Sequence, residues 1–185
     1  SLISRVDKIL VGGGMIFTFY KSKKFEIGKS IYDKTMLEMA EHLSHYEKII
    51  LPNDIVIADD KDRPEHILTV SADKIPPYMI GLDIGKDSVA QFISELEKSK
   101  MVVWNGPLGY YENKEFAKAT IEILKYLSKK HNIKTIIGGG ATVAIVEELG
   151  LRNKFYHVST GGGASLTLLE GKELPALRAL RENTK

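Results

Sequence analysis

The chain has 185 residues, 43% of them hydrophobic and 27% charged, and its formal net charge is +2. This length fits one domain with a sizeable core, and so small a charge gives no reason to expect a nucleic-acid partner. The sequence holds no run of 18 apolar residues, no secretory signal and no cysteine. We therefore expect a cytoplasmic protein with no membrane span, no disulfide and no thiolate metal site.

Strands and helices are predicted to alternate along the chain. Apolar residues at helical spacing predict helices at 15–21, 33–47, 88–98, 114–129, 142–149 and 165–169, the second with Asp33 as its N-cap. Short apolar runs predict strands at 9–11, 48–51, 55–58, 67–70, 101–104, 134–137 and 156–159, and 101–104 is expected to be buried.

This alternation favours βαβ crossovers. We therefore expect a doubly wound, Rossmann-like α/β fold in three layers, with a mostly parallel sheet and helices on both of its faces. The segment 53–77 is richer in charge and proline and is expected to form a small antiparallel excursion. Residues 1–6 resemble the last turn of a helix whose beginning is missing, so the chain is interpreted as a piece of something longer.

Three triple-glycine turns are the most informative feature of the sequence: Gly12-Gly13-Gly14, Gly138-Gly139-Gly140 and Gly161-Gly162-Gly163. Each is followed by a stretch with a helical pattern. A strand that ends in glycines and opens a helix exposes backbone N–H groups, which attract anions and phosphate above all. For any one triplet a tight turn is the simpler explanation. The three together favour a nucleotide or polyphosphate site.

Two familiar phosphate-binding motifs are absent. Gly28-Lys29-Ser30 resembles the end of a Walker A motif, but that motif needs a glycine five residues earlier, where Lys23 stands. The dinucleotide fingerprint G-x-G-x-x-G fails at all three triplets, because its last position holds Phe17, Val143 or Leu166. A nicotinamide-binding domain is therefore the weaker interpretation.

No metal-binding motif stands out either. The sequence has no His-Glu-x-x-His motif and no acid-rich calcium loop. His42 and His45 lie three residues apart on a predicted helix, a spacing that suits zinc, but an amphipathic helix surface is the simpler explanation.

The motif Trp104-Asn105-Gly106-Pro107 follows a predicted strand. Open α/β sheets bind ligands at the carboxyl ends of their strands, so Asn105 is placed to orient a phosphate or a hydroxyl. Glu112, on the next loop, is suited to accept hydrogen bonds from ribose hydroxyls. Taken alone, the motif is explained equally well by Trp104 as a core residue and Asn105 as a turn former.

Together these segments resemble the phosphoglycerate kinase family, and within it the C-terminal, nucleotide-binding domain. The resemblance is carried by DKILVGGGM (7–15), IGKS (27–30), LPND (51–54), GLDIG (81–85), WNGPLG (104–109), GGG (138–140), HVSTGGGAS (157–165) and LLEGKELP (168–175). It implies glycolytic phosphoryl transfer between 1,3-bisphosphoglycerate and ADP, giving 3-phosphoglycerate and ATP, with Mg²⁺ on the nucleotide.

The resemblance also implies site residues, position by position. The adenine slot would be lined by Gly13, Gly14, Gly81 and Leu82, with Tyr110 packing on the base and Glu112 binding the ribose. The phosphates would meet Asn105, Pro107, Gly138, Gly139, Gly140 and Thr142. Gly161 to Gly163 would face the transferring group, and Gly140, Gly162 and Gly163 are assigned to catalysis. Backbone N–H groups suit this reaction, which needs positioning and charge stabilisation more than covalent chemistry.

Several departures from the family pattern are visible. Ala141 stands where the family has an aspartate that helps to hold magnesium, so no metal ligand is assigned. Lys24 and Ala119 each replace a usual glycine. The chain lacks the family's Gly-Gly-Ala-Lys strand with its lysines, and the N-terminal domain with the basic patch that grips phosphoglycerate.

We therefore expect residues 1–185 to be part of the C-terminal nucleotide-binding domain, without the N-terminal phosphoglycerate-binding domain. The expected protein is a monomer that binds ADP or ATP, reaches 3-phosphoglycerate only through the missing domain, and is inactive alone. The alternative is a non-catalytic module for adenine-nucleotide binding or protein interaction, in which Ala141 marks lost magnesium chemistry.

Overall fold

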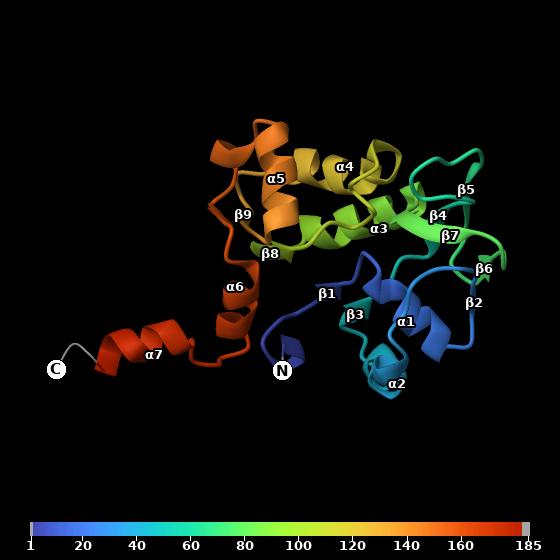
Figure 1. Ribbon diagram of the computed structural model, residues 1–185. Helices are drawn as coiled ribbons and strands as arrows, with labels where there is room; N and C mark the ends of the chain where they lie inside the picture. Colours follow the sequence, from blue (N-terminus) through green and yellow to red (C-terminus); the bar gives the residue numbers. More distant parts are fainter. Residues whose placement is uncertain (1, 183–185) are drawn as a thin grey trace.

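The computed structural model describes residues 2–182, and Ser1 of the expected first helical turn lies outside them. Helices and strands alternate along much of this range (Figure 1), except over residues 49–84, where five strands follow one another without a helix between them. The helices are α1 (Met15–Ser22), α2 (Leu37–Ser44), α3 (Lys86–Glu97), α4 (Lys118–Leu127), α5 (Gly140–Glu148), α6 (Gly162–Leu169) and α7 (Pro175–Glu182). Short 3-10 helices span Leu2–Ser4, Lys34–Met36, Lys114–Phe116 and Arg152–Lys154.

The strands form small sheets that are mostly parallel, which confirms the predicted α/β class. They are β1 (Ile9–Leu10), β2 (Glu26–Ile27), β3 (Ile49–Ile50), β4 (Asp54–Ala58), β5 (Ile67–Ser71), β6 (Lys74–Ile75), β7 (Ile80–Ile84), β8 (Met101–Asn105), β9 (Lys134–Gly138) and β10 (His157–Ser159). Parallel pairs join β1 with β3, β2 with β6, and β9 with both β8 and β10. Strand β4 pairs antiparallel with β5 and β7, which confirms the predicted excursion.

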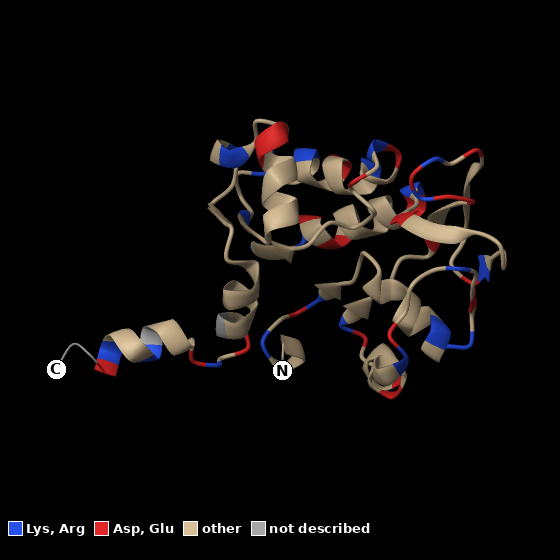
Figure 2. Cartoon of the chain, viewed as in Figure 1, with Lys and Arg blue, Asp and Glu red and all other residues tan. Residues whose placement is uncertain are grey.

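One hydrophobic core joins most of these elements. Ile55 of β4, Phe92 of α3, Leu124 of α4 and Ile137 of β9 are all almost fully buried in it. Positively and negatively charged residues are spread over helices and loops along the chain (Figure 2). Helices α6 and α7 extend away from the rest of the molecule (Figure 1). Within residues 2–182, no helix has both the length and the apolar character needed to cross a membrane.

Two long predicted helices are shorter than expected. The predicted helix 33–47 divides into a 3-10 turn and α2, and 114–129 divides into a 3-10 turn and α4. The backbone leaves α-helical geometry at the junctions, with φ −103° and ψ 5° at Met36 and φ −102° and ψ 0° at Ala117. Asp33 caps its 3-10 turn as predicted, by accepting the Thr35 N–H at 2.8 Å.

The expectation that residues 101–104 are buried is wrong for one face of the strand. Met101 and Val103 of β8 are 56% and 37% exposed, whereas Val102 and Trp104 are half-buried and pack against the core. Strand β8 lies at one end of its three-stranded sheet, and successive side chains of a strand point to opposite faces. An unbroken apolar run therefore did not mean burial on both faces.

Helix α1 ends in a Schellman motif with an unusual residue in its left-handed position. The Phe25 N–H donates to the Tyr20 carbonyl and the Lys24 N–H to the Lys21 carbonyl, both at 3.0 Å. The Phe25 and Tyr20 rings stack across the motif with centroids 6.0 Å apart. Lys24 sits at φ +63°, where glycine is the usual residue because it has no Cβ. The glycine that the resemblance implies at this position would thus have a conformational reason.

Replacing Lys24 with glycine is expected to raise the free energy of unfolding by about 0.5–1 kcal/mol. Relief of left-handed strain is worth about 1–2 kcal/mol, and the extra freedom of glycine in the unfolded chain offsets part of it. Urea denaturation of the two proteins measures the difference. Lys23→Gly is the control, because Lys23 has φ −77° and glycine there is expected to destabilise the chain. Equal effects of the two substitutions would contradict the argument.

Candidate functional site

The first glycine triplet packs against the turn that follows β8. The Gly13 N–H donates to the Leu108 carbonyl at 2.9 Å. Gly13 has φ +66°, and a Cβ there would lie 3.1 Å from the Pro107 carbonyl oxygen. The triplet is therefore held against residues 107–108 at a spacing that suits glycine.

The second and third triplets meet at the side chain of Asn105. A Cβ on Gly139 would lie 2.7 Å from Asn105 Oδ1, and one on Gly162 would lie 2.5 Å from the Gly139 nitrogen and closer still to Asn105 Oδ1. Asn105, Gly138 and Ser159 are aligned in the register of β8, β9 and β10, at the carboxyl ends of these strands. The end of β8 and the turn after it, residues 105–108, thus lie against all three triplets, which the sequence could only suggest.

Helices α5 and α6 begin inside their glycine triplets rather than after them. Their first residues are Gly140 and Gly162, not the predicted residues 142 and 165. Neither helix has an acidic residue in its first turn, α5 has no side-chain N-cap, and α6 carries no charged residue (Figure 2). A Cβ on Gly140 or Gly163 would meet no atom within 4 Å. The N-terminus of α5 at Gly140 is therefore open to an anion, whereas Gly162, the first residue of α6, is buried against Gly139.

Thr142 does not lie on the open surface of this helix terminus. It is fully buried, and its Oγ1 has no hydrogen-bond partner within the described residues. Gly140 is exposed and Ala141 is half-buried. The backbone of α5, and not the Thr142 hydroxyl, is what the helix offers to solvent.

Leu82 and Tyr110 are joined directly. The Tyr110 N–H donates to the Leu82 carbonyl at 2.7 Å, and the Tyr110 ring packs against a small cluster of Ala58, Leu82 and Phe116. Gly81 is buried beside them, with its N–H bound to Ser30 Oγ at 2.9 Å, and a Cβ there would collide with the Phe17 ring. The sequence did not predict this supporting role of Ser30 and Phe17.

Tyr110 also contacts the loop between β4 and β5. Its hydroxyl donates to Asp62 Oδ1 at 2.9 Å, and Lys61 Nζ lies 4.8 Å from the ring centroid. Asn113 Nδ2 donates to the Lys61 carbonyl at 2.9 Å. Glu112, which lies between Tyr110 and Asn113 in the sequence, is exposed. The antiparallel excursion therefore contacts Tyr110 and Asn113, a neighbour that no pattern in the sequence indicated.

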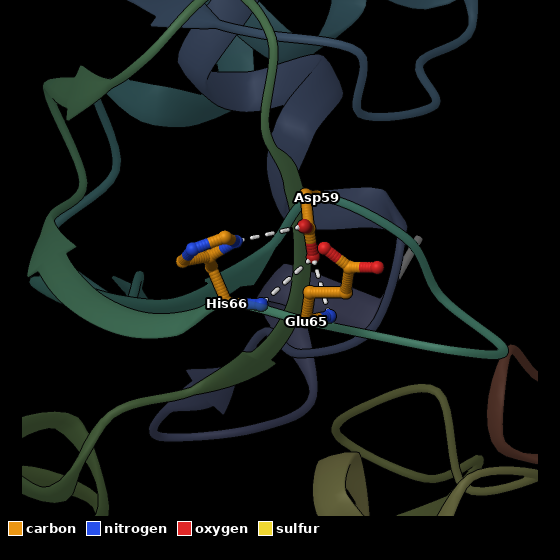
Figure 3. Close-up of side chains that lie close together, drawn as sticks. All are labelled: Asp59, Glu65 and His66. Atoms are coloured by element: carbon orange, nitrogen blue, oxygen red, sulfur yellow. Dashed lines mark hydrogen bonds and ion pairs between the residues drawn. The ribbon is translucent and has the colours of Figure 1, made fainter.

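The described residues contain one group of side chains with metal-ligating atoms close together: Asp59, Glu65 and His66, within 4.8 Å of one another (Figure 3). Asp59 Oδ1 already accepts the N–H groups of Glu65 and His66, and Oδ2 lies 3.1 Å from His66 Nδ1. The His66 side-chain bond, followed by the backbone bonds, lowers the pKa of Asp59 to about 2. These contacts close an exposed loop, which explains why the three side chains lie together. His42 instead contacts Tyr46, as an exposed helix surface predicts.

Asp83, the residue after Leu82 in β7, is a buried carboxylate. It is 3% exposed and accepts the N–H of Ile84 at 2.9 Å and of Ala119 at 3.1 Å. A Cβ on Gly109 would lie 2.5 Å from Asp83 Oδ1. Burial raises the pKa of Asp83 to about 7, although the backbone bonds and Lys118 act in the opposite direction.

Comparison with known proteins shows which family the chain belongs to. A family model described as phosphoglycerate kinase matches residues 1–172. The chain belongs to the phosphoglycerate kinase family. It is 47% identical over 187 residues to a phosphoglycerate kinase of Thermosynechococcus vestitus and 48% identical over 185 residues to one of Trichodesmium erythraeum. Each match covers 97% of this chain, and 47% and 46% of the respective relative.

Solved structures of phosphoglycerate kinases share the fold. The Coxiella burnetii enzyme superposes with a TM-score of 0.87 at 31% identity, over 96% of this chain and 47% of that one. The Pyrococcus horikoshii enzyme gives 0.82 at 28% identity, over 97% of this chain and 46% of that one. The chain thus spans about half the length of the phosphoglycerate kinases it matches.

Proposed function

We propose that this chain is the nucleotide-binding part of a phosphoglycerate kinase and corresponds to the C-terminal domain of that enzyme. The observation that carries the proposal is the meeting of three glycine triplets at residues 105–109. Near one end of these residues lies the N-terminus of α5, which has no side-chain cap, and at the other end Tyr110 packs on the apolar cluster of Ala58, Leu82 and Phe116. A nucleotide has both matching parts, an apolar base and a chain of phosphates.

The assignment of roles follows from the chemistry of each part. Adenine lies in the slot made by the first triplet, Gly81, Leu82 and Tyr110, and Glu112 accepts the ribose hydroxyls. Asn105, Pro107 and the α5 N-terminus hold the phosphates. The N–H groups at Gly140, Gly162 and Gly163 stabilise charge on the transferring group, as pre-organised backbone donors do. When bound, Mg²⁺ neutralises the phosphates; 3-phosphoglycerate binds outside this chain.

Titration with ADP, followed by backbone amide chemical shifts, tests the nucleotide site. The largest shifts are expected at Gly13–Gly14, Gly81–Leu82, Asn105–Glu112 and Gly138–Gly140. Shifts confined to the segment 53–77, or no saturable binding at all, would reject the proposal.

Gly162→Ala is expected to weaken ADP binding about tenfold or more, because the new methyl group would push Gly139 and Asn105 apart. Gly163→Ala is the matched control: it makes the same chemical change one residue later, where no atom lies within 4 Å. Calorimetric titration compares the two variants with the parent chain. Similar affinities for both variants would show that close packing of the two triplets does not matter for binding.

Ala141 leads to a prediction about magnesium. A methyl group cannot coordinate Mg²⁺, which prefers carboxylate, water and phosphate oxygens. We expect ADP affinity of this chain to depend little on Mg²⁺, and Ala141→Asp to introduce a dependence. Calorimetry with and without Mg²⁺ on both forms measures this. Equal and strong enhancement by Mg²⁺ in both forms would mean that the metal is held elsewhere.

The second candidate function, a non-catalytic nucleotide-binding module, is also motivated by Ala141. The two candidates differ in phosphorylation of 3-phosphoglycerate by ATP. Under the proposal the chain alone is inactive, and a separately made N-terminal half of a phosphoglycerate kinase restores turnover. Binding of ADP without any restored turnover would favour the non-catalytic module.

A further inference from the structure

The turn after β8 is anchored from behind by two buried polar side chains, Thr120 and Asp83. Thr120 lies in α4, is fully buried, and accepts the Leu108 N–H through Oγ1 at 2.9 Å. The carbonyl of the same Leu108 accepts the Gly13 N–H at 2.9 Å. One hydroxyl thus holds Leu108, the residue whose carbonyl accepts the N–H of the first glycine triplet.

Asp83 supports the next residue of the same turn, Gly109. Its carboxylate ties β7 to the N-terminus of α4 through Ile84 and Ala119. Gly109 passes so close to Asp83 Oδ1 that a side chain there would collide with it. On the far side of Gly109, Tyr110 donates its N–H to Leu82. Gly109, the residue before Tyr110, is therefore packed closely against both Asp83 and the Phe116 carbonyl.

We propose that Thr120 and Asp83 are positioning residues of the nucleotide site, which set the width of the slot between the first glycine triplet and Tyr110. The inference rests on the proposed function. Neither side chain reaches a ligand, because both lie behind the turn. Their effect is to hold Leu108 and Tyr110 in the binding geometry before the nucleotide arrives, which reduces the ordering that binding requires.

Thr120 provides the sharper test because two substitutions separate its hydroxyl from its volume. Thr120→Val keeps the shape but removes the acceptor of a buried N–H, and Thr120→Ser keeps the acceptor but removes a methyl group. We expect ADP affinity to fall about tenfold in Thr120→Val and to stay within about threefold of the parent in Thr120→Ser. Thr135→Val is the control, since Thr135 is buried in β9 and its Oγ1 has no partner within the described part of the chain.

Amide chemical shifts of Gly13 and Tyr110, recorded without nucleotide, give a second readout. Displacement of both in Thr120→Val, but not in Thr120→Ser, supports the inference even if the parent chain binds no ADP. Failure of the parent chain to bind ADP would reject the proposed function and not the positioning role. Parent-like ADP affinity in Thr120→Val, or equal losses in the Val and Ser variants, would overturn the inference, as would unmoved shifts.

Discussion

Gly28→Ala is expected to lower the free energy of unfolding by about 3–4 kcal/mol, because the new methyl group adds a collision to a conformational strain. Gly28 has φ +56°, which strains any residue with a Cβ by about 1–2 kcal/mol. The Cβ would also lie 2.5 Å from the Pro76 carbonyl oxygen and closer still to that of Met79. These are backbone atoms bound to neighbouring N–H groups, so they cannot turn aside as a flexible side chain would.

Gly150→Ala is the matched control for this prediction. Gly150 has φ +66°, but a Cβ there would meet no atom within 4 Å. Gly150→Ala is expected to lower the free energy of unfolding only by the conformational strain, about 1–2 kcal/mol. Chemical denaturation of both variants separates strain from collision. A Gly28→Ala protein no less stable than Gly150→Ala would mean that the 76–79 segment relaxes freely around the methyl group.

The free energy of unfolding is expected to fall by about 2–3 kcal/mol through Asp83 as the pH rises from about 5 to about 8. Burial raises the pKa of this carboxyl from its ordinary value of 3.8 to about 7 in the folded chain. Between these two values the folded state holds a proton that the unfolded state has lost. The contribution of Asp83 is therefore complete below about pH 4 and is lost as the pH passes through about 7.

Denaturation of the parent chain and of Asp83→Asn across this pH range isolates the effect, because the other titrating groups are common to both proteins. The asparagine variant is expected to lose one backbone hydrogen bond and to be less stable at pH 5. The gap between the two proteins should then close or reverse by pH 8. Parallel pH profiles would show that Asp83 does not titrate in this range.

Local signals predicted some features well. The Asp33 cap, the alternation of strands and helices and the antiparallel excursion all follow from residues close together in the chain. The rejection of Gly28-Lys29-Ser30 as a phosphate loop also agrees with the structure. Ser30 is buried and binds the Gly81 N–H, and no helix begins at these residues.

Other features were decided by distant parts of the chain. The apolar run 101–104 carries no sign that its outer face lies in solvent, because that depends on which elements pack beside β8. Helices α5 and α6 start within their glycines, where Gly139 and Gly162 approach each other closely at Asn105. No propensity scale contains such an approach, and glycine alone is a poor helix former.

By itself the sequence determined the α/β class, the three glycine turns and, through the order and spacing of its motifs, the family. It did so because periodicity, turn chemistry and motif order are local properties of the chain. Only the tertiary structure decided that the three triplets meet at the turn after β8, that Thr142 is buried, and that Thr120 and Asp83 support this turn from behind. Each of these depends on contacts between residues far apart in the chain, which packing of the shared core brings together.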